Sequence, residues 1–294
     1  MISGLPDTFP TGATLPDTQE VLVRLRSGYL TLLTATAVMV LSRPAGASQV
    51  AYEGFGPSFP IYANDGTGFG GPWTQGGFNA FASGYTPLES SLCSAKLKTS
   101  GGSVSGTAFS AINGAIRNLA FPLGQNNTTV YVSFLLQPQG TLHNGLFRGF
   151  FGLTLNGSLG NDLFVGKPGG GADDQYVLEA RGGSFQVPSG TSAVVGRTAL
   201  LVVRADFRPG KDVFTLYVDP KPSDPEPSSG AVEADLDLGV VSKIGIYSTG
   251  SFAIDEVRIG TTFAEVVPTS PHTPHGESHA CEHDDDERSD HHDR

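Results

Sequence analysis

The sequence carries little positive charge for its length. Its 294 residues include 18 Lys or Arg against 29 Asp or Glu, and the formal net charge is -11. Binding to phosphate groups requires clustered basic side chains, so this balance argues against nucleic acid as a partner. Charged residues make up 16% of the chain while Gly numbers 39, a composition typical of β domains with many tight turns.

Amphipathic helices are also missing from the pattern. Outside one apolar run near the N-terminus, no helical periodicity lasts for about ten residues. Instead, short runs rich in β-branched and aromatic residues alternate with turns that contain Gly or Pro. These runs are residues 49–55, 92–99, 114–123, 128–138, 147–157, 162–168, 175–183, 198–208, 211–220, 242–248 and 251–260. Strands that follow one another without helices predict an all-β fold of antiparallel sheets packed face to face.

The one long uncharged apolar run, residues 28–41, is typical of a secretory signal. Arg24 and Arg26 precede it, and a stretch of small residues ending at Ala47 follows. The run is too short to span a membrane comfortably. We therefore expect residues 1–47 to be a leader and signal peptide, and the mature chain to be secreted or on the cell surface without a transmembrane anchor. A buried core helix is the alternative.

The composition changes abruptly after Pro268. Residues 269–294 hold six of the seven histidines and lack aliphatic and aromatic side chains apart from Ala, so we expect a disordered tail. Within it, His279, Cys281 and His283 alternate with single residues and are suitable ligands for Zn²⁺ or Ni²⁺. The alternative is a solvated acidic terminus with no dedicated role.

The chain has only two cysteines, Cys93 in the body and Cys281 in the tail. An exported protein can form a disulfide between them. Such a bridge requires the tail to fold back onto the body, so two unpaired thiols are an equal expectation.

Several phrases along the body resemble one known family. They are VAYEGF, GTGFGGPW, LFVGKPG, TALLVVRADF, VFTLYVDPKP and FAIDEVRIGTTFAEVVP, in that order. Together they resemble the concanavalin A-like lectin/glucanase, laminin-G-like jelly-roll domains of exported bacterial proteins. The resemblance covers residues 50–268 and implies a two-sheet antiparallel β-sandwich, which we assign to residues 48–268. Members of this fold include lectins, glycanases and adhesion modules, so the fold alone does not select a function.

Residues 251–260, SFAIDEVRIG, form an expected strand with a carboxylate on an apolar face. Strict alternation places Asp255 on the face of the small and branched apolar residues, and Glu256 beside Arg258 on the other. Glu53 is in the same situation in the first strand, where it shares a face with apolar neighbours. A buried carboxylate is costly unless it is paired, hydrogen-bonded or bound to a metal.

The resemblance implies that the first and last strands lie side by side, which would bring Glu53 and Asp255 together. Two carboxylates repel unless a cation lies between them, and Ca²⁺ binds such oxygens. We therefore expect a structural Ca²⁺ held by Glu53 and Asp255. In the alternative, Asp255 accepts hydrogen bonds from backbone N–H groups of a neighbouring loop, and Glu53 faces water.

Carbohydrate binding without catalysis is the function we expect, with a glycan or the extracellular matrix as partner. Trp73 and Tyr85 are the candidate sugar contacts, although Trp73 could instead plug the sandwich edge. Glycanases of this fold often carry Glu-x-Asp-x-Glu on one strand, and the nearest match is Glu233-Ala-Asp235-Leu-Asp237. Its last acid is Asp, and the chain has a single Trp, so we assign no catalytic residue. The alternatives are a purely structural surface protein with a metal-binding tail and, less favoured, a glycoside hydrolase.

Overall fold

The computed structural model describes residues 49–56, 64–76, 85–94, 96–108, 111–145, 149–172, 174–180 and 185–270. The chain divides into two units, Met1–Gly46 and Ala47–Arg294, and every described residue belongs to the second. The expected signal peptide and nearly all of the expected tail therefore lie outside the described residues. In the described ranges, no helix has both the length and the apolar character needed to cross a membrane.

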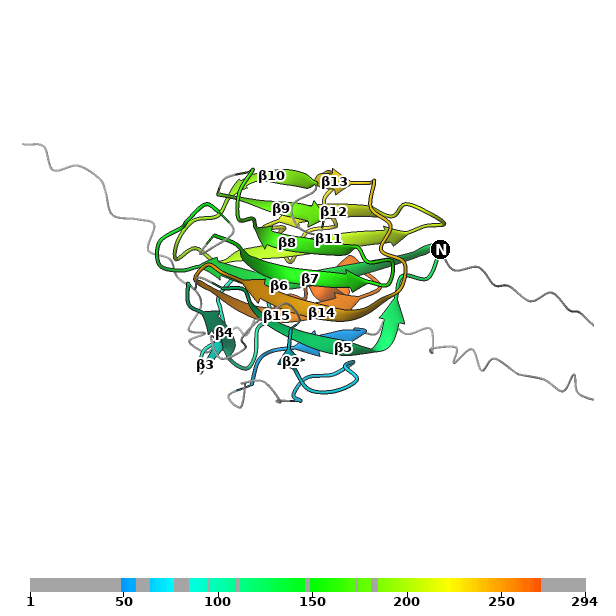
Figure 1. Cartoon of the computed structure of the whole chain (residues 1–294). Coiled ribbons are helices and arrows are strands. Elements are labelled where there is room, and N and C mark those ends of the chain that lie inside the picture. The colour runs from blue at the N-terminus through cyan, green and yellow to red at the C-terminus, as the bar shows by residue number, and fades with distance from the viewer. Residues whose placement is uncertain are drawn as a thin grey trace, which may run out of the picture. The chain divides into compact units, whose positions relative to one another are not determined.

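Two antiparallel sheets face each other in the described part of the chain (Figure 1). The first, called here the β6 sheet, has the order β13 (Ala231–Glu233), β12 (Val213–Val218), β11 (Ala199–Phe207), β6 (Thr128–Pro138), β15 (Phe252–Gly260), β4 (Ser103–Gly106) and β3 (Tyr85–Leu88), and β1 (Ala51–Glu53) also pairs with β15. The second, the β7 sheet, has the order β10 (Gln186–Ser192), β9 (Gln175–Ala180), β8 (Asp162–Lys167), β7 (Phe151–Gly157), β14 (Val241–Ser248), β5 (Asn113–Leu123) and β2 (Thr74–Gln75). The predicted all-β, two-sheet antiparallel β-sandwich is confirmed.

Alternating side chains of both sheets form the main core. Successive residues of a strand point to opposite faces, so every second residue of each central strand enters the space between the sheets. The β6 sheet contributes Val132, Phe134, Leu136, Leu201, Val203 and Ala205, and the β7 sheet contributes Leu153, Leu155, Leu163, Val165, Ile244 and Ile246. Burial of these side chains is the main source of stability for a fold without long helices.

The outer face of the β6 sheet is also covered. A second apolar cluster joins outward-facing residues of its central strands to the segment after β3 and to the short helix α2 (Phe263–Val266). The ring of Phe263 meets the rings of Tyr131 and Tyr217 edge to face, with centroids 6.2 and 6.3 Å apart. Strands buried on both faces explain why Leu200 to Val203 form a continuous apolar run rather than an alternating one.

A β-bulge in β15 changes the expected alternation of its side chains. Asp255 pairs with Leu135 and Arg258 pairs with Ser133, so β15 has one residue more than its partner at this point. Glu256 has a φ of 56°, in the left-handed region. Phe252, Ile254, Val257 and Ile259 consequently all face the main core. The expectation that Asp255 shares a face with Val257 is therefore wrong.

Cys93 is disulfide-bonded. This finding excludes the expectation of two unpaired thiols in the chain. Cys281, the other cysteine of the sequence, lies outside the described residues.

Candidate functional site

Glu53 is the last residue of β1 and points between the two sheets. The pairing of β1 with β15 that the resemblance implies is confirmed, with Ala51 opposite Ile259 and Glu53 opposite Val257. Glu53 is only 2% exposed, so the alternative in which it faces water is wrong. Its Oε1 accepts the N–H of Phe55 at 2.9 Å, and its Oε2 accepts the indole N–H of Trp73 at 3.0 Å.

Arg117 of β5 completes this buried cluster by forming an ion pair with Glu53 across the two sheets. Its guanidinium also donates to the backbone oxygens of Gly71 at 2.9 Å and Asp65 at 2.6 Å. The guanidinium carbon lies 4.0 Å from the centre of the Phe69 ring. Burial raises the pKa of Glu53, while the Trp73 hydrogen bond and the Arg117 charge oppose the rise. The cluster therefore has a structural role: its ion pair links a strand of the β6 sheet to a strand of the β7 sheet.

Asp255 lies on the outer face of the β6 sheet, the side to which its cross-strand neighbour Leu135 points. Its Oδ2 accepts the N–H of Leu92 at 2.8 Å, and its Oδ1 accepts the N–H of Glu256 at 2.6 Å. The alternative in which Asp255 binds backbone N–H groups of a neighbouring loop is therefore confirmed. Burial, together with the nearby charge of Glu256, raises the pKa of Asp255 to about 9.

Glu256 and Arg258 form a second buried ion pair on that outer face. The Tyr52 hydroxyl donates to Glu256 Oε1 at 3.1 Å, and the Ser100 backbone N–H donates to the same oxygen. The expected proximity of Glu256 and Arg258 is thus confirmed, although both are buried rather than partly solvated.

The expected calcium ligands are not brought together. Glu53 points into the space between the sheets, whereas Asp255 lies on the opposite face of the same sheet. Both oxygens of each carboxylate already accept hydrogen bonds, so the pair does not fit a shared Ca²⁺. Within the described ranges, no group of three or more His, Cys, Asp or Glu side chains could hold a metal. The expected tail ligands His279, Cys281 and His283 lie outside the described residues.

The two expected sugar contacts belong to the core. Trp73 is 0% exposed and stacks on Phe55 with ring centroids 6.0 Å apart, in agreement with the alternative that it plugs the sandwich edge. Tyr85 is 5% exposed, and its hydroxyl donates to the backbone oxygen of Ile246 at 3.2 Å. Neither ring presents a face to a ligand, so the prediction that they contact sugar is wrong.

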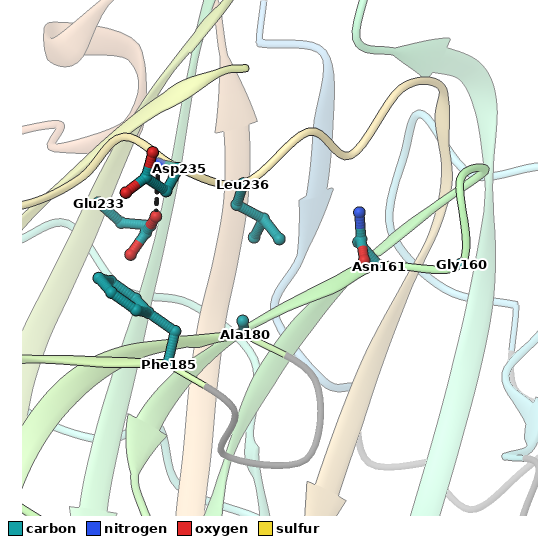
Figure 2. A pocket seen from close by; sticks show the side chains of 7 residues that line it. All are labelled: Gly160, Asn161, Ala180, Phe185, Glu233, Asp235 and Leu236. Carbon is teal, nitrogen blue, oxygen red and sulfur yellow. Dashed lines mark hydrogen bonds between the residues drawn. The ribbon is translucent and has the colours of Figure 1, made fainter. Parts of the chain in front are cut away.

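A pocket of about 400 Å³ opens where the edge strands of the two sheets meet. Strand β13 ends the β6 sheet and β10 ends the β7 sheet, and these two strands lie side by side at that edge (Figure 1). Figure 2 shows the seven residues that line the pocket, which are Gly160, Asn161, Ala180, Phe185, Glu233, Asp235 and Leu236. They come from the β7–β8 turn, the end of β9, the residue before β10, and the end of β13 together with the segment that follows it.

Glu233, the last residue of β13, is the buried acid of this pocket. It is 2% exposed, and its Oε1 accepts the backbone N–H of Asp235 at 2.6 Å. Among the described residues, its Oε2 has no hydrogen-bond partner, and it points toward the ring of Phe185 (Figure 2). A buried carboxylate oxygen without a partner costs free energy, so this atom marks a place where a ligand could supply a hydrogen bond.

The remaining groups add exposed charge and apolar surface. Asp235 accepts from Lys211 Nζ at 2.7 Å, and both side chains are mostly exposed. Asn161 Nδ2 donates to the backbone oxygen of Asp237 at 2.7 Å, which holds the segment after β13 against the β7–β8 turn. Phe185 is 45% exposed, a large apolar surface to leave in contact with water. The pocket can therefore offer an aromatic face beside two carboxylates.

Sequence reasoning identified part of this pocket. The run from Glu233 to Asp237 stood out as the nearest match to a glycanase motif, and its first two acids do line one pocket. Asp237 does not, because its Oδ1 accepts the N–H of Gly239 within its own turn. Phe185 was missed, since an aromatic residue between two strands gives no signal of what lies opposite it.

No family model matches the chain, and no curated protein matches it. Among solved structures, it is similar to an endo-1,3-beta-glucanase from Streptomyces sioyaensis, with a TM-score of 0.45 and 10% identity, over 74% of this chain and 98% of that one. It is also similar to the Emp47p carbohydrate recognition domain, with a TM-score of 0.41 and 11% identity, over 75% and 99%. The T. cruzi calreticulin globular domain gives a TM-score of 0.37 and 10% identity, over 63% and 86%.

Proposed function

We propose that this domain binds carbohydrate, without hydrolysing it, in the pocket lined by Phe185 and Glu233. The observation that carries the proposal is the half-exposed Phe185 ring beside a carboxylate with an unpartnered oxygen. A sugar presents an apolar C–H face, which suits an aromatic ring, and hydroxyl donors, which suit a carboxylate. A cavity of about 400 Å³ falls within the usual size of small-molecule sites.

The proposed partner is an extracellular glycan or matrix polysaccharide. The arginine pair, the apolar run and the small residues that end at Ala47 support export, so the binding would take place outside the cell or on its surface. This role needs no metal at the pocket.

Hydrolysis is the second candidate, because Glu233 and Asp235 line the same pocket. A glycoside hydrolase needs one carboxyl group as acid and another as base or nucleophile, on either side of the bond that breaks. Here the two acids are joined by the hydrogen bond from Asp235 N–H to Glu233, and Asp235 is also paired with Lys211. That arrangement favours binding over two separate catalytic roles.

The test is affinity electrophoresis of the full chain against a panel of neutral, acidic and amino polysaccharides. Binding to at least one of them is expected, and Phe185→Ala should weaken it about tenfold because the aromatic contact is lost. Phe121→Ala is the matched control, since Phe121 is 56% exposed but does not line the pocket. Absence of binding throughout the panel, or equal losses in both variants, would overturn the proposal.

A parallel assay for new reducing ends separates binding from hydrolysis. The bound polysaccharide should keep its chain length after long incubation. Reducing ends that increase with the natural chain and not with Glu233→Gln would replace the proposed function by the second candidate.

A further inference from the structure

We propose that the pocket selects a positively charged ligand, so that its preferred carbohydrate carries free, protonated amino groups. The inference rests on the proposed function and names the class of sugar. It comes from a second site in the same molecule, where a glutamate with the same strand position, exposure and first hydrogen bond is already paired with a cation.

Glu53 and Glu233 occupy equivalent local settings. Each ends a three-residue strand at the β6 sheet, AYE in β1 and AVE in β13. Each is 2% exposed. In each, Oε1 accepts the backbone N–H of the residue two positions later, from Phe55 at 2.9 Å and from Asp235 at 2.6 Å. The two carboxylates therefore leave Oε2 as the atom that the surroundings must satisfy.

At Glu53, a cation and the neutral indole N–H of Trp73 together satisfy that atom. The guanidinium of Arg117 pairs with Oε2 while its plane lies over the Phe69 ring, so the cation is held between a carboxylate and an aromatic face. Carboxylate and ring act together, because the ring quadrupole attracts positive charge and the buried site reduces screening by water.

At Glu233, the carboxylate and the ring are present, and no described residue donates a hydrogen bond to Oε2. Phe185 lies where Oε2 points (Figure 2), and Asp235 adds a second negative charge at the pocket. A neutral hydroxyl would supply the hydrogen bond but no positive charge. A protonated amine supplies both, and it can also lie against the ring face as Arg117 does against Phe69.

Two surface groups control access to this position. Lys211 pairs with Asp235, and because both side chains are mostly exposed, an incoming ammonium group can replace it at little cost. The ring of Phe185 screens Oε2 from water, but a half-exposed side chain can change rotamer quickly and admit the amine.

The experiment compares two oligosaccharides that differ only in the amino group. Glucosamine oligomers and N-acetylglucosamine oligomers of equal length and linkage are titrated into the full chain by calorimetry, with a neutral glucose oligomer as a third ligand. The glucosamine oligomer should bind at least about tenfold more tightly than the other two, and raised salt should weaken its binding alone.

Two variants locate the effect. Glu233→Gln should lower affinity for the glucosamine oligomer about tenfold, the loss expected for a charge-assisted hydrogen bond, and should weaken binding of the neutral oligomers by a smaller factor, because Gln still offers a hydrogen-bond acceptor. Lys211→Ala should raise affinity for the same oligomer, because it removes a competing cation. Lys221→Ala removes the same charge at the other end of β12 and is the matched control for net charge.

The outcomes separate this inference from the proposed function. Equal affinity for the amino and acetylated oligomers overturns the charge preference and leaves carbohydrate binding in place. Preference for the amine that Glu233→Gln does not reduce also overturns it, because the negative net charge of the chain would then be the cause. If no polysaccharide binds at all, the proposed function fails and this inference fails with it.

Discussion

The two buried glutamates Glu53 and Glu233 differ in what surrounds one carboxylate oxygen, Oε2. Their strands, exposures and first hydrogen bonds match. Oε2 of Glu53 is bound by Trp73 and Arg117, whereas Oε2 of Glu233 has no hydrogen-bond partner in the described part of the chain. In the first arrangement, the ion pair between Glu53 and Arg117 lies between the two sheets and links them. The second retains an unfavourable group at the sandwich edge, which is typical of sites where stability is given up for binding.

The largest expected effect is at the paired glutamate. Arg117→Met should lower the free energy of unfolding by about 3–5 kcal/mol, because the buried Glu53 carboxylate would lose its charged partner and would be left either ionised and unpaired or protonated. Urea unfolding measures the loss. Arg197→Ala is the control, since its side chain is 62% exposed in a surface pair with Asp219, and a change below about 1 kcal/mol is expected. Similar losses in both variants would contradict the structural role of Arg117.

A smaller, pH-dependent effect is expected at Asp255. Its pKa is raised from 3.8 to about 9 by burial, so between these values the folded chain holds a proton that the unfolded chain releases. Its contribution to stability is complete below the lower value and is lost as the pH rises through the upper one. Asp255→Asn keeps the shape without the titration.

Unfolding of the natural chain and of Asp255→Asn at several pH values tests this. The variant should be less stable than the natural chain at about pH 4, because its amide nitrogen cannot accept one of the two backbone N–H groups, and it should gain relative to the natural chain up to about pH 9. A constant difference across this range would show that Asp255 does not titrate as described.

The smallest effect, and the sharpest contrast, comes from the same change at both glutamates. Glu233→Gln should leave the free energy of unfolding within about 1 kcal/mol of the natural value or raise it, because Glu233 Oε2 makes no hydrogen bond to the described residues that the change could break. Glu53→Gln should lower it by more than about 2 kcal/mol, because Arg117 loses its ion pair. The urea unfolding midpoints of the two variants, each compared with the natural chain, measure these changes. Equal destabilisation by both changes would show that Glu233 has a partner in solution.

The fold was predictable because it depends on patterns that repeat. Period-two alternation and turn residues located most strands, and the pairing of first with last strand followed from the resemblance. The faces of the β15 side chains were wrongly predicted because the strand contains one added residue. Glu256 takes a left-handed conformation there, which a glutamate does not predict. That one residue moved Asp255 to the other face of the sheet and removed the expected calcium site.

The site was harder to predict than the fold. The two acids of the pocket are close in the sequence and could be noticed together. Phe185 joins them only because the edge strands β10 and β13 meet in space, and Trp73 is excluded only because its indole donates to a buried carboxylate. Contacts of this kind depend on how two sheets are stacked, which no local pattern encodes.

The pairing of β1 with β15 also has a mechanical consequence. Val50 N–H donates to the backbone oxygen of Ile259 at 2.7 Å, so the start of the first strand lies against the end of the last. After β15, the chain passes through α2 and is held to residues 96–98 by the bonds Lys98 N–H to Pro268 O and Ser270 N–H to Lys96 O, each 2.9 Å. Tension applied between Val50 and Ser270 would therefore unzip hydrogen bonds one at a time instead of shearing a whole strand. The stretch that opens first would contain Glu53, and the pocket at the opposite edge would carry little of the load.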